Sequence, residues 1–306
     1  MKKSGLALSV IVSFMVAVTG PLFAAPGAPK WADVHYGPDA QQTFDLWAPT
    51  SRDGPSPIVV VFHPGGFISG DKHPCLQKFI DKMLARGVAV ACANYRLAPQ
   101  ARYPAQMMDG GRALQWIRHN HAQFGIDSDR VSVMGLSAGG AIALWLAFNQ
   151  DLADANSADP VSRESTRVVA VATSNAQATY DPKTIASAFH TQQLPKFLAE
   201  FFGVGSVEEL RNPQLSENER NASPVEYVHA GEPPALIYYT ADEASLPPNS
   251  SPPDYIHNPA QGRLLEKAGK DRGARIEFHA GHDYPGAWDG FLDAAAAFFD
   301  ASFRGK

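Results

Sequence analysis

The chain has 306 residues, of which 45% are hydrophobic and 19% are charged. That composition excludes a disordered tail, a fibre and a small disulfide-stapled protein, and the length suits one α/β domain of about 250 residues with insertions. The 26 Lys and Arg residues against 31 Asp and Glu residues give a net charge of −5. We expect no nucleic-acid partner, because phosphate backbones are bound by strongly basic surfaces.

Residues 1–24 are expected to be a secretory signal peptide. Lys2 and Lys3 precede an uncharged apolar run that ends in small residues, which is the order typical of such peptides. Cleavage after Ala24 would leave residues 25–306 as one domain with a net charge of −7, exported to the periplasm or the medium. The alternative is an uncleaved membrane anchor. The run is shorter than the roughly 20 residues that a membrane span prefers, so we expect no stable membrane insertion after signal removal.

Apolar runs with strand and helix periodicities alternate along the rest of the chain. The expected strands are 32–37, 42–49, 57–62, 87–93, 130–135, 167–173 and 234–240, and the expected helices include 104–125 and 294–303. Most of these strands are continuous apolar runs, as strands buried on both faces are. The predicted fold class is therefore α/β, a mostly parallel twisted sheet with helices on both faces and an antiparallel start.

Residues 175–232 interrupt this alternation and are predicted to form an inserted cap. The stretch 194–202 places leucine and phenylalanine side chains on one helical face. Phe197, Phe201 and Phe202 either shape an apolar pocket over an active site or fill the core, and the sequence leaves both readings open.

Two cysteines are compatible with a disulfide. Cys75 opens a predicted helix and Cys92 lies in the strand that follows it. The rise along the helix and the return along the strand bring the two cysteines to a similar level of the fold. An oxidising compartment permits the bond, whereas Cys92 could equally be a small buried apolar residue.

Ser137 is the candidate nucleophile. It follows the strand RVSVMG and precedes the apolar helix AIALWLAFN, with Gly135 and Gly139 on either side. A G-x-S-x-G turn between a strand and a helix lifts the serine hydroxyl toward substrate and places it beside the positive end of the helix dipole.

The stretch HPGGF, which follows the strand 57–62, is the candidate oxyanion hole. Acyl transfer creates a negatively charged oxygen that fixed backbone N–H groups stabilise best. Gly65 and Gly66 allow close approach, and Pro64 has no N–H to offer. The predicted donors are Gly65, Gly66 and Ala138.

A serine nucleophile needs a histidine base and a carboxylate that orients it. His282, in AGHDYPG, lies in the loop where the chain order serine, acid, histidine expects the base, whereas the competing His279 ends a strand. Asp242 and Glu243 both follow the strand 234–240 at the carboxyl edge of the sheet, and either carboxylate could reach the histidine.

The motifs HPGGF, NYRLAP, GLSAGG, PPALIYYTADEASLP and AGHDYPG occur in one order along the chain. In this the chain resembles the α/β-hydrolase-fold esterases of the hormone-sensitive-lipase-like and acetylxylan- and feruloyl-esterase-like groups. The resemblance implies an α/β-hydrolase fold with a mobile cap and hydrolysis of carboxylic esters through an acyl-enzyme. It also implies Ser137 as nucleophile, His282 as base, and the oxyanion donors named above.

The chain departs from the family pattern where the acid is expected. YYTADEA replaces the more familiar histidine-glycine followed by aspartate, and an ungapped fit places the acid on Glu243. A one-residue deletion would place it on Asp242. We therefore predict Glu243, with Asp242 as the alternative.

The predicted function is that of a secreted serine carboxylesterase acting on short-chain acyl esters or acylated polysaccharides. The alternatives are a serine peptidase of the prolyl-oligopeptidase type and a non-enzymatic binding module with the same fold. The sequence carries no metal or cofactor motif, so we expect neither. It leaves the oligomeric state open.

Overall fold

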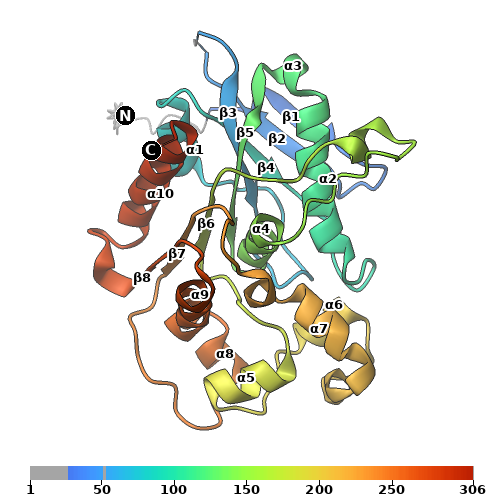
Figure 1. Cartoon of the computed structure of the whole chain (residues 1–306), viewed down its shortest axis with the longest axis vertical. Coiled ribbons are helices and arrows are strands. Elements are labelled where there is room, and N and C mark those ends of the chain that lie inside the picture. Colours follow the sequence, from blue (N-terminus) through green and yellow to red (C-terminus); the bar gives the residue numbers. More distant parts are fainter. Residues whose placement is uncertain (1–26, 51–52, 306) are drawn as a thin grey trace, which may run out of the picture.

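The structure is a computed structural model that describes residues 27–50 and 53–305, so the expected signal peptide lies outside the described residues. Eight strands form one open sheet in the order β1-β2-β4-β3-β5-β6-β7-β8 (Figure 1). β1 and β2 pair antiparallel, as do β2 and β4, and all other neighbours are parallel. The predicted fold class, a mostly parallel sheet with an antiparallel start, is confirmed.

Strands and helices alternate along much of the chain. The strands are β1 (Trp31–His35), β2 (Thr43–Trp47), β3 (Ser56–Phe62), β4 (Ala89–Ala93), β5 (Ile126–Leu136), β6 (Val171–Ser174), β7 (Ala235–Tyr239) and β8 (Ile276–Ala280). The helices are α1 (Gln77–Leu84), α2 (Ala105–His119), α3 (His121–Phe124), α4 (Ala138–Phe148), α5 (Pro182–Phe189), α6 (Phe197–Phe202), α7 (Ser216–Ala222), α8 (Pro252–Tyr255), α9 (Pro259–Arg272) and α10 (Trp288–Phe303). Within the described ranges, none of the helices has the length and apolar character needed to cross a bilayer.

Helices cover both faces of the sheet because its central strands are apolar on both sides. Along β3, the side chains of Ile58 and Val60 belong to the larger core cluster, and those of Val59 and Val61 belong to the smaller one. The larger cluster includes side chains of α2 and α4, and the smaller one those of α1 and α10. A continuous apolar run is thus required in such a strand, as the sequence predicted.

Several element boundaries differ from the prediction, and β5 and α10 begin earlier than expected, at Ile126 and Trp288. The helix expected over 104–125 is broken at Asn120 into α2 and α3, because the Asn120 side-chain amide donates a hydrogen bond to the Trp116 carbonyl at 2.9 Å and caps the end of α2. The strand expected over 167–173 is shorter, since β6 begins only at Val171.

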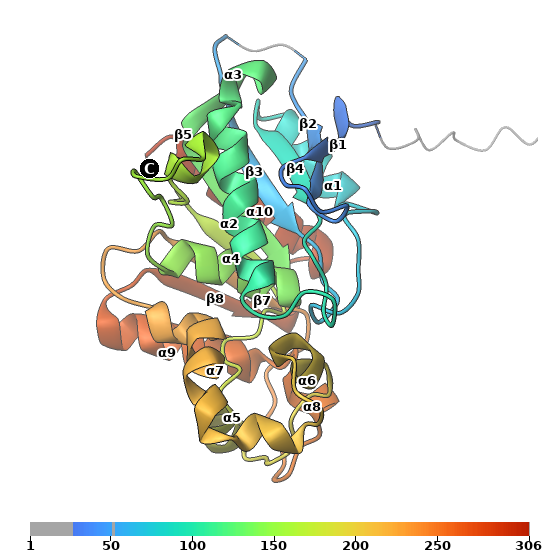
Figure 2. The ribbon, with the colours of Figure 1, turned by 90° about the vertical axis from the view of Figure 1, so that its right-hand side faces the viewer.

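The segment predicted as a cap, residues 175–232, holds α5, α6 and α7. Together with α8 they lie beyond one end of the sheet, at the bottom of Figure 2. This is the end at which the parallel strands terminate, because the turn after β5 contacts the turn after α8 there.

Candidate active site

Ser137 occupies a strained turn between β5 and α4. Its φ of 49° and ψ of −119° lie outside the usual regions for a residue with a side chain. A Cβ on Gly135 would stand 2.1 Å from the Gly139 carbonyl oxygen, and one on Gly139 would stand 2.3 Å from the Phe62 carbonyl oxygen. Both glycines are therefore required by close backbone approach, which explains the G-x-S-x-G spacing.

The loop after β3 presents two glycines in left-handed conformations, Gly65 with φ 129° and Gly66 with φ 61°. A Cβ on Gly65 would stand 1.9 Å from the Ser69 carbonyl oxygen. Within the described part of the chain, the backbone N–H groups of Gly65, Gly66 and Ala138 have no acceptor. The sequence predicted these three N–H groups as the oxyanion donors, and the structure leaves all three without a partner in the described residues.

The root of this loop is anchored in the core. The carbonyl of His63 accepts a hydrogen bond from the Tyr95 hydroxyl at 2.9 Å, and the two rings stack 4.2 Å apart. Burial lowers the pKa of His63 below its ordinary value, so the imidazole is neutral. A fixed loop keeps oxyanion donors in place without reorganisation during the reaction.

A cavity of about 340 Å³ adjoins this loop. Its wall includes His63 and Pro64 before the two glycines, and Leu136 directly before Ser137. On the cap side, a Cβ on Gly66 would stand 3.3 Å from the Phe197 ring, so this half-buried phenylalanine of α6 lies against the loop. Phe201, by contrast, is buried and stacks 4.1 Å from Phe67, so it fills the core.

His282 is paired with Asp242. Its Nδ1 lies 2.9 Å from Asp242 Oδ1, and its backbone N–H donates to the same oxygen at 3.2 Å. Gly281 has a φ of 52°, and a Cβ there would stand 1.7 Å from Asp242 Oδ1, so only glycine permits the contact. The hydrogen bond with His282 lowers the pKa of Asp242, which keeps this carboxylate ionised.

The structure does not bring Glu243, the preferred acid, to His282. Both Glu243 carboxylate oxygens bind the guanidinium of Arg263 on α9, with Nε to Oε2 at 2.9 Å. The alternative acid, Asp242, is the one that contacts the histidine.

The structure does not give His282 the hydrogen bond to the serine. The partner of Ser137 Oγ is His257 Nε2, at 2.8 Å. His257 lies in the turn between α8 and α9, and the sequence did not single it out. Its position in the segment that follows β7, at the carboxyl edge of the sheet, is the feature of the sequence that could have identified it as a site residue. The His282 side chain is 87% exposed on the turn after β8.

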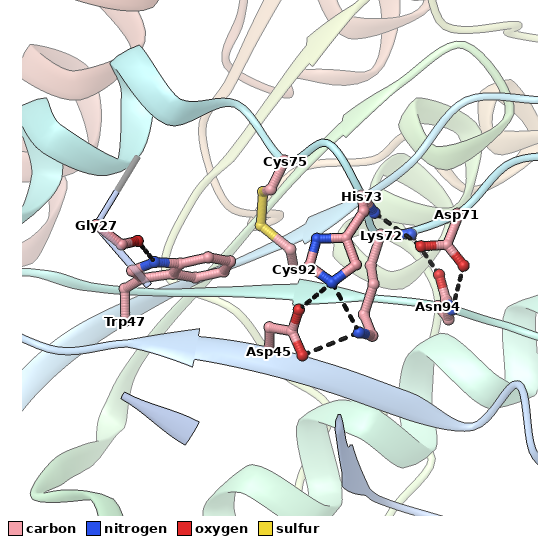
Figure 3. Close-up of a disulfide and its surroundings, with 9 residues drawn as sticks. All are labelled: Gly27, Asp45, Trp47, Asp71, Lys72, His73, Cys75, Cys92 and Asn94. Carbon is pink, nitrogen blue, oxygen red and sulfur yellow. Dashed lines mark hydrogen bonds and ion pairs between the residues drawn. A yellow bond between two sulfur atoms is a disulfide. The ribbon is translucent and has the colours of Figure 1, made fainter. Parts of the chain in front are cut away.

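A disulfide joins Cys75 to Cys92, with the Cα atoms 6.2 Å apart (Figure 3). Cys92 belongs to β4, and Cys75 precedes α1, so the bond ties the segment after the oxyanion loop to the sheet. Beside it, Lys72 Nζ lies 2.9 Å from Asp45 Oδ1, and both side chains are buried. The disulfide and the ion pair together fix the far end of the loop.

Replacing both cysteines by alanine is expected to lower the free energy of unfolding by about 3 kcal/mol, since the bond closes a loop with a sequence separation of 17 residues. The melting temperature should fall by roughly 6–12 °C. Differential scanning calorimetry of the variant, with wild type under dithiothreitol as the comparison, measures the effect. Equal melting temperatures would show that the bond adds nothing to stability.

Among the residues described, no group of three or more His, Cys, Asp or Glu side chains is arranged to hold a metal ion.

Comparison with known proteins places this geometry in a family. The BD-FAE family model matches residues 44–253. Esterase LipQ of Mycobacterium tuberculosis is 29% identical over 278 residues, which cover 88% of this chain and 59% of LipQ. The probable isoprenylcysteine alpha-carbonyl methylesterase ICMEL1 of Arabidopsis thaliana is 27% identical over 219 residues, which cover 71% of this chain and 44% of ICMEL1. The chain thus spans about half the length of these curated relatives.

Solved structures share the fold. A truncated carbohydrate esterase from gut microbiota has a TM-score of 0.69 at 18% identity, covering 90% of this chain and 96% of that one. The esterase Est2 of Thermogutta terrifontis has a TM-score of 0.59 at 21% identity, covering 85% of each chain. Since the family model spans more than half of the residues, the chain belongs to the BD-FAE family, among the α/β-hydrolase-fold esterases of the hormone-sensitive-lipase-like and feruloyl-esterase-like group.

Proposed function

We propose that this chain is an exported serine carboxylesterase that hydrolyses short-chain acyl esters or acylated polysaccharides. The observation that carries the proposal is the setting of Ser137. Its hydroxyl stands on a strained turn, bonded to an imidazole, beside three backbone N–H groups that have no acceptor in the described structure.

In the proposed reaction, Ser137 Oγ attacks the ester carbonyl while its proton passes to His282 Nε2. The carbonyl oxygen becomes negative and is held by the N–H groups of Gly65, Gly66 and Ala138. His282 then protonates the departing alcohol, and a water molecule releases the acyl group by the same steps in reverse. The reaction requires His282 Nε2 to reach Ser137 Oγ when substrate is bound. Asp242 engages Nδ1 of this exposed ring, and Nε2 has no partner among the described residues.

The surroundings of the site support a small acyl group. The cavity of about 340 Å³ behind the oxyanion loop is walled largely by apolar side chains and the disulfide, and Phe197 covers the opposite side of the loop. Export is supported by the expected signal peptide and by the disulfide, because structural disulfides persist in oxidising compartments.

The proposal is tested with a panel of p-nitrophenyl esters from acetate to decanoate, together with acetylated xylan and methyl ferulate. We expect kcat/KM to be highest for acetate to butyrate and to fall at least about tenfold by decanoate, since the Phe197 ring lies against the oxyanion loop and limits the room for a long chain there. Peptide p-nitroanilides serve as the control for peptidase activity. No ester hydrolysis, together with no labelling by a fluorophosphonate, would indicate a binding module instead.

A further inference from the structure

The side chain bonded to Ser137 is a histidine for which the proposed reaction has no role. His257 Nε2 lies 2.8 Å from Ser137 Oγ, which is the length of a full hydrogen bond. The two residues are 120 positions apart in sequence. The contact therefore depends on the tertiary structure and not on local chain geometry.

The turn that carries His257 is held on both sides. On one side, the buried Tyr255 donates a hydrogen bond from its hydroxyl to the Gln193 carbonyl at 2.7 Å. On the other side, the Asn258 side chain accepts from the Ala260 N–H at 2.9 Å and caps the start of α9. The backbone on both sides of His257 is therefore held in place by hydrogen bonds.

Gln177 links this turn to the nucleophile. Its side-chain amide donates to the carbonyl oxygens of Ile256 and Asn175, each at 3.2 Å, and these two bonds use both of its N–H groups. The same nitrogen lies 3.4 Å from Ser137 Oγ, the longest of its three contacts. Gln177 therefore holds the turn beside the nucleophile in place.

The two imidazoles near the site differ in their partners. His257 keeps part of its side chain exposed, and the protein atoms around the rest desolvate it and lower its pKa. The ring is therefore neutral near pH 7 and carries one N–H. Within the described residues no carboxylate contacts His257, whereas Asp242 Oδ1 lies 2.9 Å from His282 Nδ1. A carboxylate stabilises the imidazolium that forms when a histidine takes a proton. The serine proton is therefore better accepted by His282 than by His257.

We propose that His257 is a second catalytic histidine, whose Nε2–H donates to one lone pair of Ser137 Oγ. The other lone pair is left to attack the ester carbonyl, and the hydroxyl proton is left to pass to His282. This inference rests on the proposed function. One proton moves from Oγ to His282 and on to the departing alcohol, and His257 keeps its own. The His257 N–H stabilises the negative charge that grows on Oγ when its proton leaves, and again when the acyl carbon separates from Oγ.

The test compares His257→Gln, His257→Glu and His257→Ala in the full chain. Gln and Glu have the same shape, but Gln retains an N–H donor and Glu at neutral pH offers only acceptors. We expect the Ala variant to lose roughly 10- to 100-fold in kcat for p-nitrophenyl acetate with KM changed by less than about threefold. The Gln variant should recover at least about fivefold over Ala, the Glu variant should recover nothing, and the rate of fluorophosphonate labelling should follow kcat. His35→Gln, an exposed histidine on β1, is the control.

Three results would overturn the inference. Unchanged kcat and labelling in the Ala variant would make the contact incidental. A Glu variant more active than the Gln variant would identify His257 as the base. Equal losses in all three variants, with melting temperatures that fall in proportion, would assign His257 a structural role. Full hydrolysis by Ser137→Ala would instead contradict the proposed function, whatever the His257 variants show.

Discussion

Ser137→Ala is expected to lower kcat/KM for p-nitrophenyl acetate by roughly 10⁴-fold or more. The hydroxyl is the only group at the turn between β5 and α4 that can form an acyl-enzyme, and the oxyanion donors have no intermediate to stabilise without it. Alanine adds no atoms at this strained position, so the fold should persist. Steady-state kinetics, together with the loss of fluorophosphonate labelling, measures the effect.

The control is Ser187→Ala, an exposed serine on α5 whose hydroxyl bonds only the Thr184 carbonyl. It should retain wild-type kinetics. Activity of the Ser137 variant within tenfold of wild type, at an unchanged melting temperature, would exclude the serine mechanism and with it the function proposed for this chain.

Asp242→Asn should lower kcat by roughly 10³-fold, whereas Glu243→Gln should change it by less than about threefold. The Asp242 carboxylate binds His282 Nδ1 at 2.9 Å, and an amide there removes the charge that fixes the tautomer and stabilises the imidazolium. Glu243 binds Arg263 at the surface, an ion pair worth at most about 1 kcal/mol of stability. Both changes replace a carboxylate by an amide of the same shape.

The pair of variants separates the two acids within one assay series. Since the hydrogen bond with His282 lowers the pKa of Asp242, the carboxylate is lost only in strongly acidic solution, and the comparison is valid at neutral pH. A larger loss in Glu243→Gln than in Asp242→Asn would reverse the assignment that the geometry supports.

Most of the fold could be predicted from the sequence because buried parallel strands must be apolar on both sides. The run 57–62 corresponds to β3 within one residue, and its adjacent valines belong to different core clusters. Periodicity could not show the break at Asn120, where one side-chain amide bonds back to Trp116 and ends the helix. Such a break depends on a single hydrogen bond and leaves the apolar pattern intact.

The site was predictable where local backbone geometry dictates the residue type. A Cβ placed on Gly65, Gly135 or Gly139 would lie under 2.5 Å from a neighbouring backbone atom. The backbone geometry therefore requires glycine at these positions, and the sequence motifs reflect it. The choice between Asp242 and Glu243 was not encoded in this way. It depends on which of two adjacent side chains faces the turn after β8, where Gly281 leaves room for Asp242 alone. His257 was missed because no motif surrounds it and its partner lies 120 residues away.

That separation also sets the order in which the site is assembled during synthesis. The nucleophile turn can form once β3, β5 and α4 are present, but its hydroxyl then lacks every imidazole partner. His257, Asp242 and His282 arrive only with the segment from β7 to β8, which joins one edge of the sheet last in chain order. A chain shortened before β7 would therefore carry the serine without any of these three partners. The proposed hydrolytic activity would appear only after the last strands have joined the sheet.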